Sequence, residues 1–299
     1  MVFSGHFRSG KFSRRRLLKS GFFGAAGLAL YSGEIERHWV EITHTEVRLP
    51  GLSAAYDGAR LVQLSDIHLD EYTEPFFLNH VIGQVNRLQP DAVLLTGDFV
   101  SVGPRSNKFA LGAAWQCAVL LKQLQCRQLY AVMGNHDVEV SSGEVTSALT
   151  ANGITVLTNT CLPIERMGQR TGGRIWLAGV DDPLQGHPDP ELAVPAAIRN
   201  LPEEPVILMC HGPDYADYLL TTPAGQSVDL MLSGHTHGGQ VRIPFVGPLT
   251  LPPLGMKYVE GWFRFGKMQL YVNRGIGAVG VPFRFDCPPE ITVFTLRRA

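Results

Sequence analysis

One pattern constrains this chain more than any other: a short apolar run followed by a potential metal ligand, repeated five times along the sequence. Each run has four or five residues, mostly Val, Ile, Leu, Ala or Met, and turn residues follow it. Runs of this kind are typical of strands that are buried on both faces of a parallel sheet. The five stretches, each including the polar residues after the run, are 60–68, 92–98, 129–137, 206–212 and 228–239.

The polar residues after these runs are Asp, Asn and His, whose oxygen and nitrogen atoms bind divalent metals. In open α/β sheets, ligands bind outside the carboxyl ends of the strands, so we expect these side chains to converge on one site. The set has no thiolate and includes an amide, whereas structural zinc sites favour Cys and His. The pattern therefore favours a catalytic metal site with the candidate ligands Asp66, His68, Asp98, Asn135, His211, His235 and His237.

Two of these candidates, His235 and His237, are spaced i and i+2. In an extended chain such residues point to the same side, and neutral imidazoles held in this way form a pair of metal ligands. The same spacing also occurs in ordinary strands. The metal interpretation therefore depends on the four similar stretches upstream.

The order of the segments predicts an α/β architecture in one domain, for which 299 residues are sufficient. Helices expected at 75–88 and 109–125 separate the first strand runs, which implies a parallel arrangement there. Short strand-like runs at 154–157 and 175–180, with glycine turns between them, favour antiparallel pairing. The other expected segments are a strand at 38–49, a loop at 102–107, helices at 189–200 and 214–220, and strands and loops over 240–297.

The first thirty residues have the layout of a signal peptide, because a basic region precedes the apolar, glycine-containing segment 21–30. That segment is short for a bilayer span. Residues 13–19, Ser-Arg-Arg-Arg-Leu-Leu-Lys, resemble a twin-arginine export signal. We expect residues 1–33 to be this signal or a membrane anchor and residues 34–299 to be the domain, exported to the periplasmic or extracytoplasmic side. The alternative is a basic tail ahead of a surface helix, and cleavage of the leader stays open.

Charge and cysteine content exclude two classes of protein. A net charge of −1 gives no reason to expect a nucleic-acid partner. Five cysteines, with no C-x-x-C pair, do not form a disulfide framework. Cys117 and Cys126 fall on one expected helix, where they are too far apart along the axis to pair.

In their order, D-x-H, G-D, G-N-H-D, a single His and G-H-T-H resemble the signature of calcineurin-like metallophosphoesterases. The resemblance runs from about Arg60 to the C-terminus. Residues 179–183, 235–240, 273–277 and 284–291 look like the YkuE/YaeI-type branch, whose relatives include exported or membrane-associated phosphodiesterases and pyrophosphatases that act on UDP-2,3-diacylglucosamine. The resemblance implies a four-layer α/β/β/α sandwich with the site at the strand ends.

The family resemblance also implies a role for each candidate. Two divalent ions, manganese, zinc or iron, would hold a hydroxide between them for attack on phosphorus. His136 would lie near the leaving group as general acid or phosphate contact. The implied ligands are Asp66, His68 and His237 for one ion, Asn135, His211 and His235 for the other, and Asp98 as the bridge.

One position departs from the family pattern. Many relatives continue the second motif as G-D-x-x-D, and the last acid of that motif steadies the catalytic histidine. Here Ser101 occupies that position. We therefore expect the orientation of His136 either to come from elsewhere, with Asp137 and Asp182 as the candidates, or to be looser.

The resemblance implies a phosphodiesterase or pyrophosphatase acting on a small-molecule or lipid-linked phosphate such as UDP-2,3-diacylglucosamine. We expect a monomer, and the N-terminal segment predicts membrane association. A phosphomonoesterase and a non-catalytic, metal-binding envelope protein are the alternatives. Arg274 and Arg284 are either phosphate contacts or structural arginines. Trp262, Phe263 and Phe265 either form an apolar lip for a lipid chain or pack as the core of a hairpin.

Overall fold

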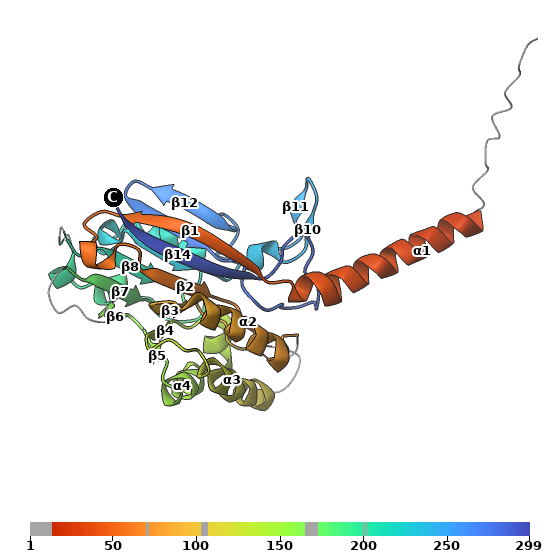
Figure 1. Ribbon diagram of the computed structural model, residues 1–299, viewed down its shortest axis with the longest axis horizontal. Helices are drawn as coiled ribbons and strands as arrows, with labels where there is room; N and C mark the ends of the chain where they lie inside the picture. Colours follow the sequence, from red (N-terminus) through yellow and green to blue (C-terminus); the bar gives the residue numbers. More distant parts are fainter. Residues whose placement is uncertain (1–13, 70–71, 103–106, 165–172, 200, 202) are drawn as a thin grey trace, which may run out of the picture.

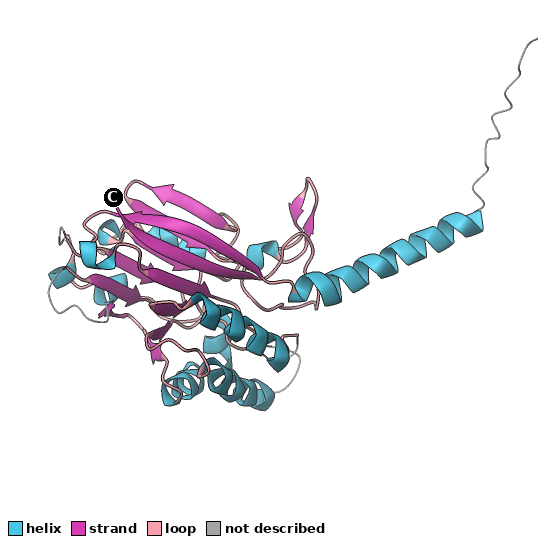
Figure 2. Cartoon of the chain, in the orientation of Figure 1, coloured by secondary structure: helices cyan, strands magenta, loops and turns pink. Residues whose placement is uncertain are grey.

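The computed structural model of the chain describes residues 14–69, 72–102, 107–164, 173–199, 201 and 203–299. Residues 103–106 of the expected loop at 102–107 lie outside these ranges, as do the basic residues before Arg14 and the last residue of the expected helix 189–200. Within the described ranges, two sheets stack face to face and helices cover their outer faces (Figures 1 and 2).

The first sheet has six strands, with the parallel strands β2, β3 and β4 at its centre. β14 pairs antiparallel with β2 and parallel with β1, while β5 pairs parallel with β4. In spatial order the strands are β1 (Glu41–Leu49), β14 (Glu290–Arg298), β2 (Arg60–Leu64), β3 (Ala92–Leu95), β4 (Leu129–Ala131) and β5 (Thr155–Val156).

The second sheet also has six strands, and four of them, β13, β9, β8 and β7, are parallel. Antiparallel strands close both of its edges. In spatial order the strands are β12 (Gly261–Phe265), β13 (Met268–Val272), β9 (Leu230–Ser233), β8 (Val206–Met209), β7 (Ile175–Gly179) and β6 (Thr160–Ile164).

Alternation along the strands builds three hydrophobic layers. In β3, Val93 and Leu95 pack on the helix side of the first sheet, while Ala92 and Leu94 face the second sheet. The outer helices of the first sheet are α2 (Pro75–Leu88), α3 (Asn107–Leu121) and α4 (Asn135–Ala151). The short helices α5 (Pro190–Ala193) and α6 (Ala216–Leu219) cover the second sheet. The expected four-layer sandwich is therefore confirmed.

The N-terminal helix α1 (Arg14–Leu30) projects from this body (Figure 1). A π-helical turn (Tyr31–Ile35) and a 3-10 turn (Glu36–His38) join it to the sandwich. This junction is fixed by hydrogen bonds, because Cys287 N donates to Glu36 at 2.7 Å and Arg284 N donates to the Ser32 carbonyl at 3.0 Å. None of the described helices combines the length and apolarity needed to cross a bilayer.

Two expectations about secondary structure are wrong. The helix expected at 189–200 is broken into α5 and a 3-10 turn (Ala196–Ile198), because Pro195 between them has no N–H to continue the helix. The strand at 154–157 pairs parallel as β5 rather than antiparallel, since α4 returns the chain to the same edge after β4. Antiparallel pairing holds for β6 with β7, although β7 pairs parallel with β8.

Two smaller expectations also change. Cys126 does not share a helix with Cys117, because α3 ends at Leu121, and all five cysteines are unpaired. The first strand begins at Glu41, since the residues before it form the turn at the root of α1. The helix expected at 75–88 is found with the same bounds as α2.

Candidate metal centre

The candidate ligands lie where the parallel strands of both sheets end. Their positions are Asp66 and His68 after β2, Asp98 after β3, Asn135 at the start of α4 after β4, His211 after β8, and His235 and His237 after β9. The two sheets present the carboxyl ends of these strands to the same region. The strand-end pattern in the sequence therefore predicted the assembly of these side chains.

Five of the candidates have left-handed backbone, with φ of 52° at Asp66, 48° at His68, 57° at Asp98, 74° at His235 and 51° at His237. A non-glycine residue in this region costs of order 1–3 kcal/mol, and such residues cluster at functional sites. His235 and His237 are thus not in extended chain, and the expectation that they form one pair on one side is wrong. Each histidine joins a different cluster.

The first cluster contains Asp66, His68 and His237, whose ligand atoms all lie within 4.8 Å of one another. Nε2 of His237 is 3.1 Å from Nε2 of His68 and 3.4 Å from Oδ1 of Asp66. All three side chains are buried. One carboxylate and two imidazoles in this arrangement can hold a divalent ion.

The second cluster contains Asp98, His211 and His235, which also lie within 4.8 Å of one another and are buried. Nε2 of His211 is 3.2 Å from Nδ1 of His235 and 3.1 Å from Oδ2 of Asp98. The same Asp98 oxygen is 3.5 Å from Nε2 of His68 in the first cluster. Asp98 therefore reaches both clusters with one oxygen.

Asn135 lines the same groove as Asp98 and His235 of the second cluster. Its side-chain Oδ1 is buried and has no hydrogen-bond partner among the described residues. An unpaired buried amide oxygen costs free energy unless a ligand satisfies it. A cation at the groove end lined by Asp98 and His235 is one group that could satisfy it.

Backbone carbonyls fix which nitrogen of two histidines points inward. Nδ1 of His211 is 2.7 Å from the Thr96 carbonyl, and Nε2 of His235 is 2.7 Å from the Pro253 carbonyl. A carbonyl oxygen accepts only from an N–H, so these outer nitrogens are protonated. The inner nitrogens, Nε2 of His211 and Nδ1 of His235, therefore face the cluster, which is how protein outer shells orient metal-binding histidines.

Different partners hold the two histidines of the first cluster. Ser101 Oγ is 2.8 Å from Nδ1 of His68, and Nη2 of Arg284 is 3.4 Å from Nδ1 of His237. Ser101 leaves Nε2 of His68 directed at the cluster, whereas the Arg284 guanidinium is a donor facing Nδ1 of His237. Ser101, noted in the sequence only as a departure from the family motif, thus orients a candidate ligand.

Burial and charge set the protonation of the cluster without ions. Burial lowers the pKa of His68 and His237 well below the usual value, with the Arg284 charge adding to the effect on His237. Burial also lowers the pKa of His235. These three rings are therefore neutral.

Asp98 and His211 form the charged pair of the site. Burial alone would raise the pKa of Asp98, but the charge of His211 holds it well below the ordinary value. Burial alone would lower the pKa of His211, but Asp98 raises it well above the usual range. The proton shared by His211 and Asp98 balances the charge of the carboxylate. Metal binding to such sites releases protons.

Asp137 supports the loop that carries Asp98. Its carboxylate accepts hydrogen bonds from the backbone N–H groups of Asp98 at 2.8 Å, Phe99 at 2.9 Å and Gly134 at 3.0 Å. A Cβ at Gly134 would lie 2.1 Å from Oδ1 of Asp98, so only glycine permits this approach. Burial, with the nearby Asp98 charge, raises the pKa of Asp137 to about 8.

His136 is oriented by a backbone amide. Val102 N donates to Nδ1 of His136 at 2.8 Å, so the neutral ring carries its proton on Nε2. The ring of His136 is 5.0 Å from the ring of His68 and lines the groove described below. The expectation that Asp137 or Asp182 orients His136 is wrong, because Asp137 binds the loop amides and Asp182 accepts from the N–H groups of a following turn.

The two clusters open into a groove of about 1180 Å³. Apart from the candidate ligands and His136, its described lining contains no acidic, basic or histidine side chain. One part of its apolar wall is formed by Ile243 and Leu249. Ile243 lies on the hairpin of β10 (Arg242–Ile243) and β11 (Gly247–Pro248), and Leu249 follows it. Ala25 and Leu28 of α1 form another part. The metal centre is therefore reached along an apolar path.

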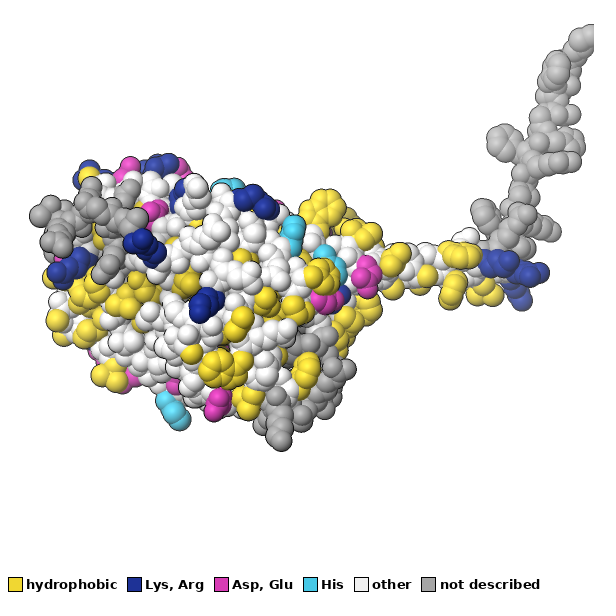
Figure 3. Space-filling view, turned by 60° about the horizontal axis from the view of Figure 1, so that its bottom comes forward, with side chains coloured by type: hydrophobic (Ala, Val, Ile, Leu, Met, Phe, Trp, Pro, Cys, Tyr) yellow, Lys and Arg dark blue, Asp and Glu magenta, His cyan; other side chains and the backbone are white. Residues whose placement is uncertain are grey.

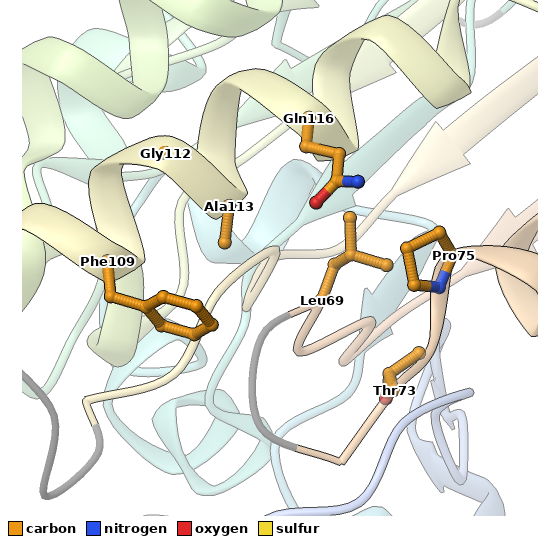
Figure 4. Close-up of a pocket in the computed structure, with 7 residues that line it drawn as sticks. All are labelled: Leu69, Thr73, Pro75, Phe109, Gly112, Ala113 and Gln116. Atoms are coloured by element: carbon orange, nitrogen blue, oxygen red, sulfur yellow. The ribbon is translucent and has the colours of Figure 1, made fainter.

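A smaller cavity of about 260 Å³ lies between the start of α2 and α3 (Figure 4). Leu69, Pro75, Phe109 and Ala113 contribute to its lining. None of its described lining residues is acidic, basic or histidine. It offers no metal ligand, and the groove is the candidate functional site.

The remaining candidates have structural roles. The guanidinium of Arg284 is fully buried and donates to the carbonyls of Gly277 and Cys287, and Arg274 is paired with Glu41 and Glu290. Neither arginine lines the groove. The aromatic residues of β12 pack within the fold, with Trp262 against Tyr271 and Phe294, and Phe263 and Phe265 against Tyr258.

A two-sheet α/β sandwich that gathers two adjacent clusters of metal ligands at its strand ends has the architecture of a binuclear metallohydrolase. The chain matches the calcineurin-like phosphoesterase family over residues 59–239, more than half of its length, and it belongs to this family of metal-dependent hydrolases. Two related proteins cover almost the whole chain. The metallophosphoesterase YkuE of Bacillus subtilis is 36% identical, with 96% of this chain and 98% of YkuE covered. The phosphodiesterase YaeI of Escherichia coli is 31% identical, with 95% and 99% covered.

A third relative has a named substrate. LpxG of Chlamydia muridarum, a UDP-2,3-diacylglucosamine pyrophosphatase, is 28% identical, with 88% of this chain and 91% of LpxG covered. The expected resemblance to this family and to these relatives is therefore confirmed.

Proposed function

We propose that this protein hydrolyses a phosphodiester or pyrophosphate bond with the help of two divalent ions. The single observation that carries the proposal is the position of Asp98 Oδ2, 3.5 Å from Nε2 of His68 in one cluster and 3.1 Å from Nε2 of His211 in the other. A carboxylate oxygen shared between two adjacent buried clusters is consistent with a two-ion phosphoesterase.

In this proposal the first ion is held by Asp66, His68 and His237, the second by Asn135, His211 and His235, and both by Asp98. When bound, such ions generate a nucleophile from water at neutral pH and neutralise the charge that develops on the phosphoryl oxygens. Manganese, zinc and iron all accept this donor set.

His136 supplies the remaining polar contact. Its neutral ring presents an Nε2–H because Val102 N occupies Nδ1, so it donates a hydrogen bond to a phosphoryl or leaving-group oxygen. A preorganised donor of this kind stabilises charge in the transition state without reorganisation. The walls of the groove are largely apolar, and an apolar surrounding strengthens such an interaction.

The apolar groove supports a substrate with an apolar chain next to its phosphate. A lipid-linked nucleotide sugar such as UDP-2,3-diacylglucosamine, the substrate in the name of LpxG, has this combination. The groove extends from the metal ligands to α1 and to the β10–β11 hairpin, so it has room for groups on both sides of a phosphorus atom. This favours a diester or pyrophosphate over a monoester.

We also propose that the protein is exported through the twin-arginine route and works outside the cytoplasmic membrane. The support is the sequence of residues 13–19, followed by the apolar segment of α1. Residues 1–33 would act as the signal or as the membrane anchor.

The test is hydrolysis by the full-length chain after loading with manganese, zinc or iron. We expect metal-dependent turnover of bis-p-nitrophenyl phosphate and of UDP-2,3-diacylglucosamine, slower turnover of p-nitrophenyl phosphate, and loss of all activity with a chelator. Faster turnover of the monoester would identify a phosphomonoesterase. Metal binding without hydrolysis of any of the three would identify a non-catalytic metal-binding protein.

A further inference from the structure

The mouth of the groove carries a set of exposed large apolar side chains, which we call the apolar rim. Its most exposed members, Phe245 and Val246, lie at the tip of the β10–β11 hairpin, where Phe245 is fully exposed and Val246 is 76% exposed. The sequence from 243 to 256 contains no charged residue. Apolar side chains gathered in this way mark an interaction surface. The rim consists of Ile243, Phe245, Val246, Leu249, Val281 and Phe283.

The rim is continuous with the root of α1. Ile243, Leu249, Val281 and Phe283 line the same groove as Ala25, Leu28 and Ala29 of α1. In Figure 1 the β10–β11 hairpin lies at the end of the body from which α1 projects. Whatever covers the apolar rim therefore also meets the C-terminal turns of α1.

Helix α1 is apolar on every side beyond its basic start. Leu18, Phe22, Phe23 and Leu30 are between 60% and 74% exposed. A Cβ added to any of its three glycines would meet no atom within 4 Å, so no part of the body packs on those positions. An apolar helix of this kind is stable when an apolar medium surrounds it. A protein partner would cover one side, whereas lipid covers all sides.

The charges of α1 agree with a lipid surface. Arg14, Arg15 and Lys19 lie in its first turns, and the helix contains no Asp or Glu. Figure 3 shows basic side chains at the far end of α1 and hydrophobic side chains along it and around the place where it leaves the body. Basic residues next to an apolar segment are attracted to anionic lipid headgroups.

We infer that the apolar rim and α1 dock together into one lipid bilayer, with Phe245 and Val246 inserted among the acyl chains and the mouth of the groove at the membrane surface. The folded domain thus contributes to membrane attachment together with the N-terminal segment. This inference rests on exposure and position and not on hydrolysis. Under the proposed function, a lipid-linked phosphate would enter the groove directly from the bilayer.

The first experiment places a fluorescent probe on the hairpin of the full-length chain. The variant Phe245→Trp is mixed with vesicles of equimolar phosphatidylethanolamine and phosphatidylglycerol, with or without bromine on the acyl chains, and the emission of the parent chain is subtracted. The matched control is Leu192→Trp, a residue that is 63% exposed on α5, the helix that contacts β6. In Figure 1, β6 lies at the end of the body away from α1. We expect brominated lipid to quench the introduced tryptophan of the hairpin variant and not that of the control. A vesicle-bound chain whose hairpin probe is not quenched would show attachment by α1 alone and overturn the inference.

The second experiment removes the apolar tip. The double variant Phe245→Asp with Val246→Asp changes two rim residues that do not line the groove. We expect its partitioning onto the same vesicles to fall by about tenfold or more, because two apolar side chains leave the lipid. The matched double variant Leu192→Asp with Val119→Asp alters two exposed apolar residues elsewhere and should bind as the parent does.

Two further measurements keep the outcome clear. Both double variants should unfold at the temperature of the parent, so that a loss of binding reflects the surface and not the fold. Sedimentation without lipid tests whether a second copy of the chain covers the rim instead. If the parent chain is a dimer and the Phe245→Asp, Val246→Asp variant is a monomer, docking to a bilayer is contradicted. Equal vesicle binding by both double variants would contradict it as well.

Discussion

Ser101 Oγ lies 2.8 Å from Nδ1 of His68, and through this contact a residue outside both clusters fixes the direction of a candidate ligand. Nε2 of His68 faces Asp66 and His237. In the tautomer that leaves Nε2 unprotonated, Nδ1–H donates to the Ser101 hydroxyl. Ser101 occupies the position at which many family members have an acid that orients their catalytic histidine, the residue equivalent to His136. Here the hydroxyl serves His68, and the amide of the next residue, Val102, holds His136.

Ser101→Ala should therefore weaken the first metal site. Loss of an outer-shell partner costs about 10–100-fold in metal affinity or activity in comparable sites. We expect that loss at the site of Asp66, His68 and His237, measured by competition with a chromophoric chelator, and a smaller change at the second site.

The matched control for this variant is Ser233→Ala. Ser233 is a buried serine at the end of β9 whose hydroxyl has no hydrogen-bond partner among the described residues. It should bind both ions as the parent does. If both alanine variants lose the same affinity, the effect of Ser101 comes from packing and not from its contact with His68.

Asp98→Ala should remove both ions, because Asp98 Oδ2 is the atom that lies within reach of both clusters. His68→Ala should empty the first site and leave the second at least partly occupied, since His211, His235 and Asn135 are unchanged. Metal analysis of the two purified variants measures this. Equal metal loss in the two variants would contradict a bridging role for Asp98.

The sequence predicts which side chains assemble because strand ends in a parallel sheet are local features. A buried run such as 92–95 and the Asp98 after it can be recognised without knowing the rest of the fold. The fold class follows from the same runs, and helix α2 was predicted with its bounds because Pro75 marks its first residue. Most features of the site that the sequence did not predict are contacts between distant segments, whereas the break of the expected helix 189–200 lies at Pro195, a local feature.

The partners of the ligands illustrate this limit. The Pro253 carbonyl meets His235, and the Thr96 carbonyl meets His211 across 115 positions of sequence. A backbone carbonyl has no signature in the sequence, and neither does the Val102 amide that binds His136. The left-handed backbone at His235 and His237 was also invisible, since glycine, the usual signal for positive φ, does not occupy those positions.

Replacing Arg14 and Arg15 by Lys should leave the protein in the cytoplasm, because a twin-arginine signal depends on the arginine pair and not on its charge alone. The measurement is the distribution of the full-length chain between cytoplasmic and exported fractions. Replacement of Lys19 by Arg keeps the charge and the pair, and serves as the control that should be exported normally. Unchanged export of the double lysine variant would contradict this route.

His136→Ala should keep both ions and the fold but hydrolyse a diester more slowly. His136 lies next to Asn135, outside both clusters, and lines the groove. General acid catalysis contributes roughly 10²–10⁴-fold. We expect the lower part of that range, since Val102 N occupies Nδ1 and the neutral ring acts through Nε2–H. Rates with nitrophenolate and alkoxide leaving groups measure the role, because the alkoxide needs the donor more.

The comparison of leaving groups separates the two roles of His136. A larger loss on the alkoxide than on nitrophenolate would place His136 at the leaving oxygen, and an equal loss on both would place it on a phosphoryl oxygen. His136→Gln tests the hydrogen-bond account, because an amide N–H donates but transfers no proton at neutral pH. Partial rescue by Gln is expected if a hydrogen bond from the neutral ring is the main contribution. A fall in metal content in either variant would show that His136 binds an ion, which the position of its ring against His68 argues against.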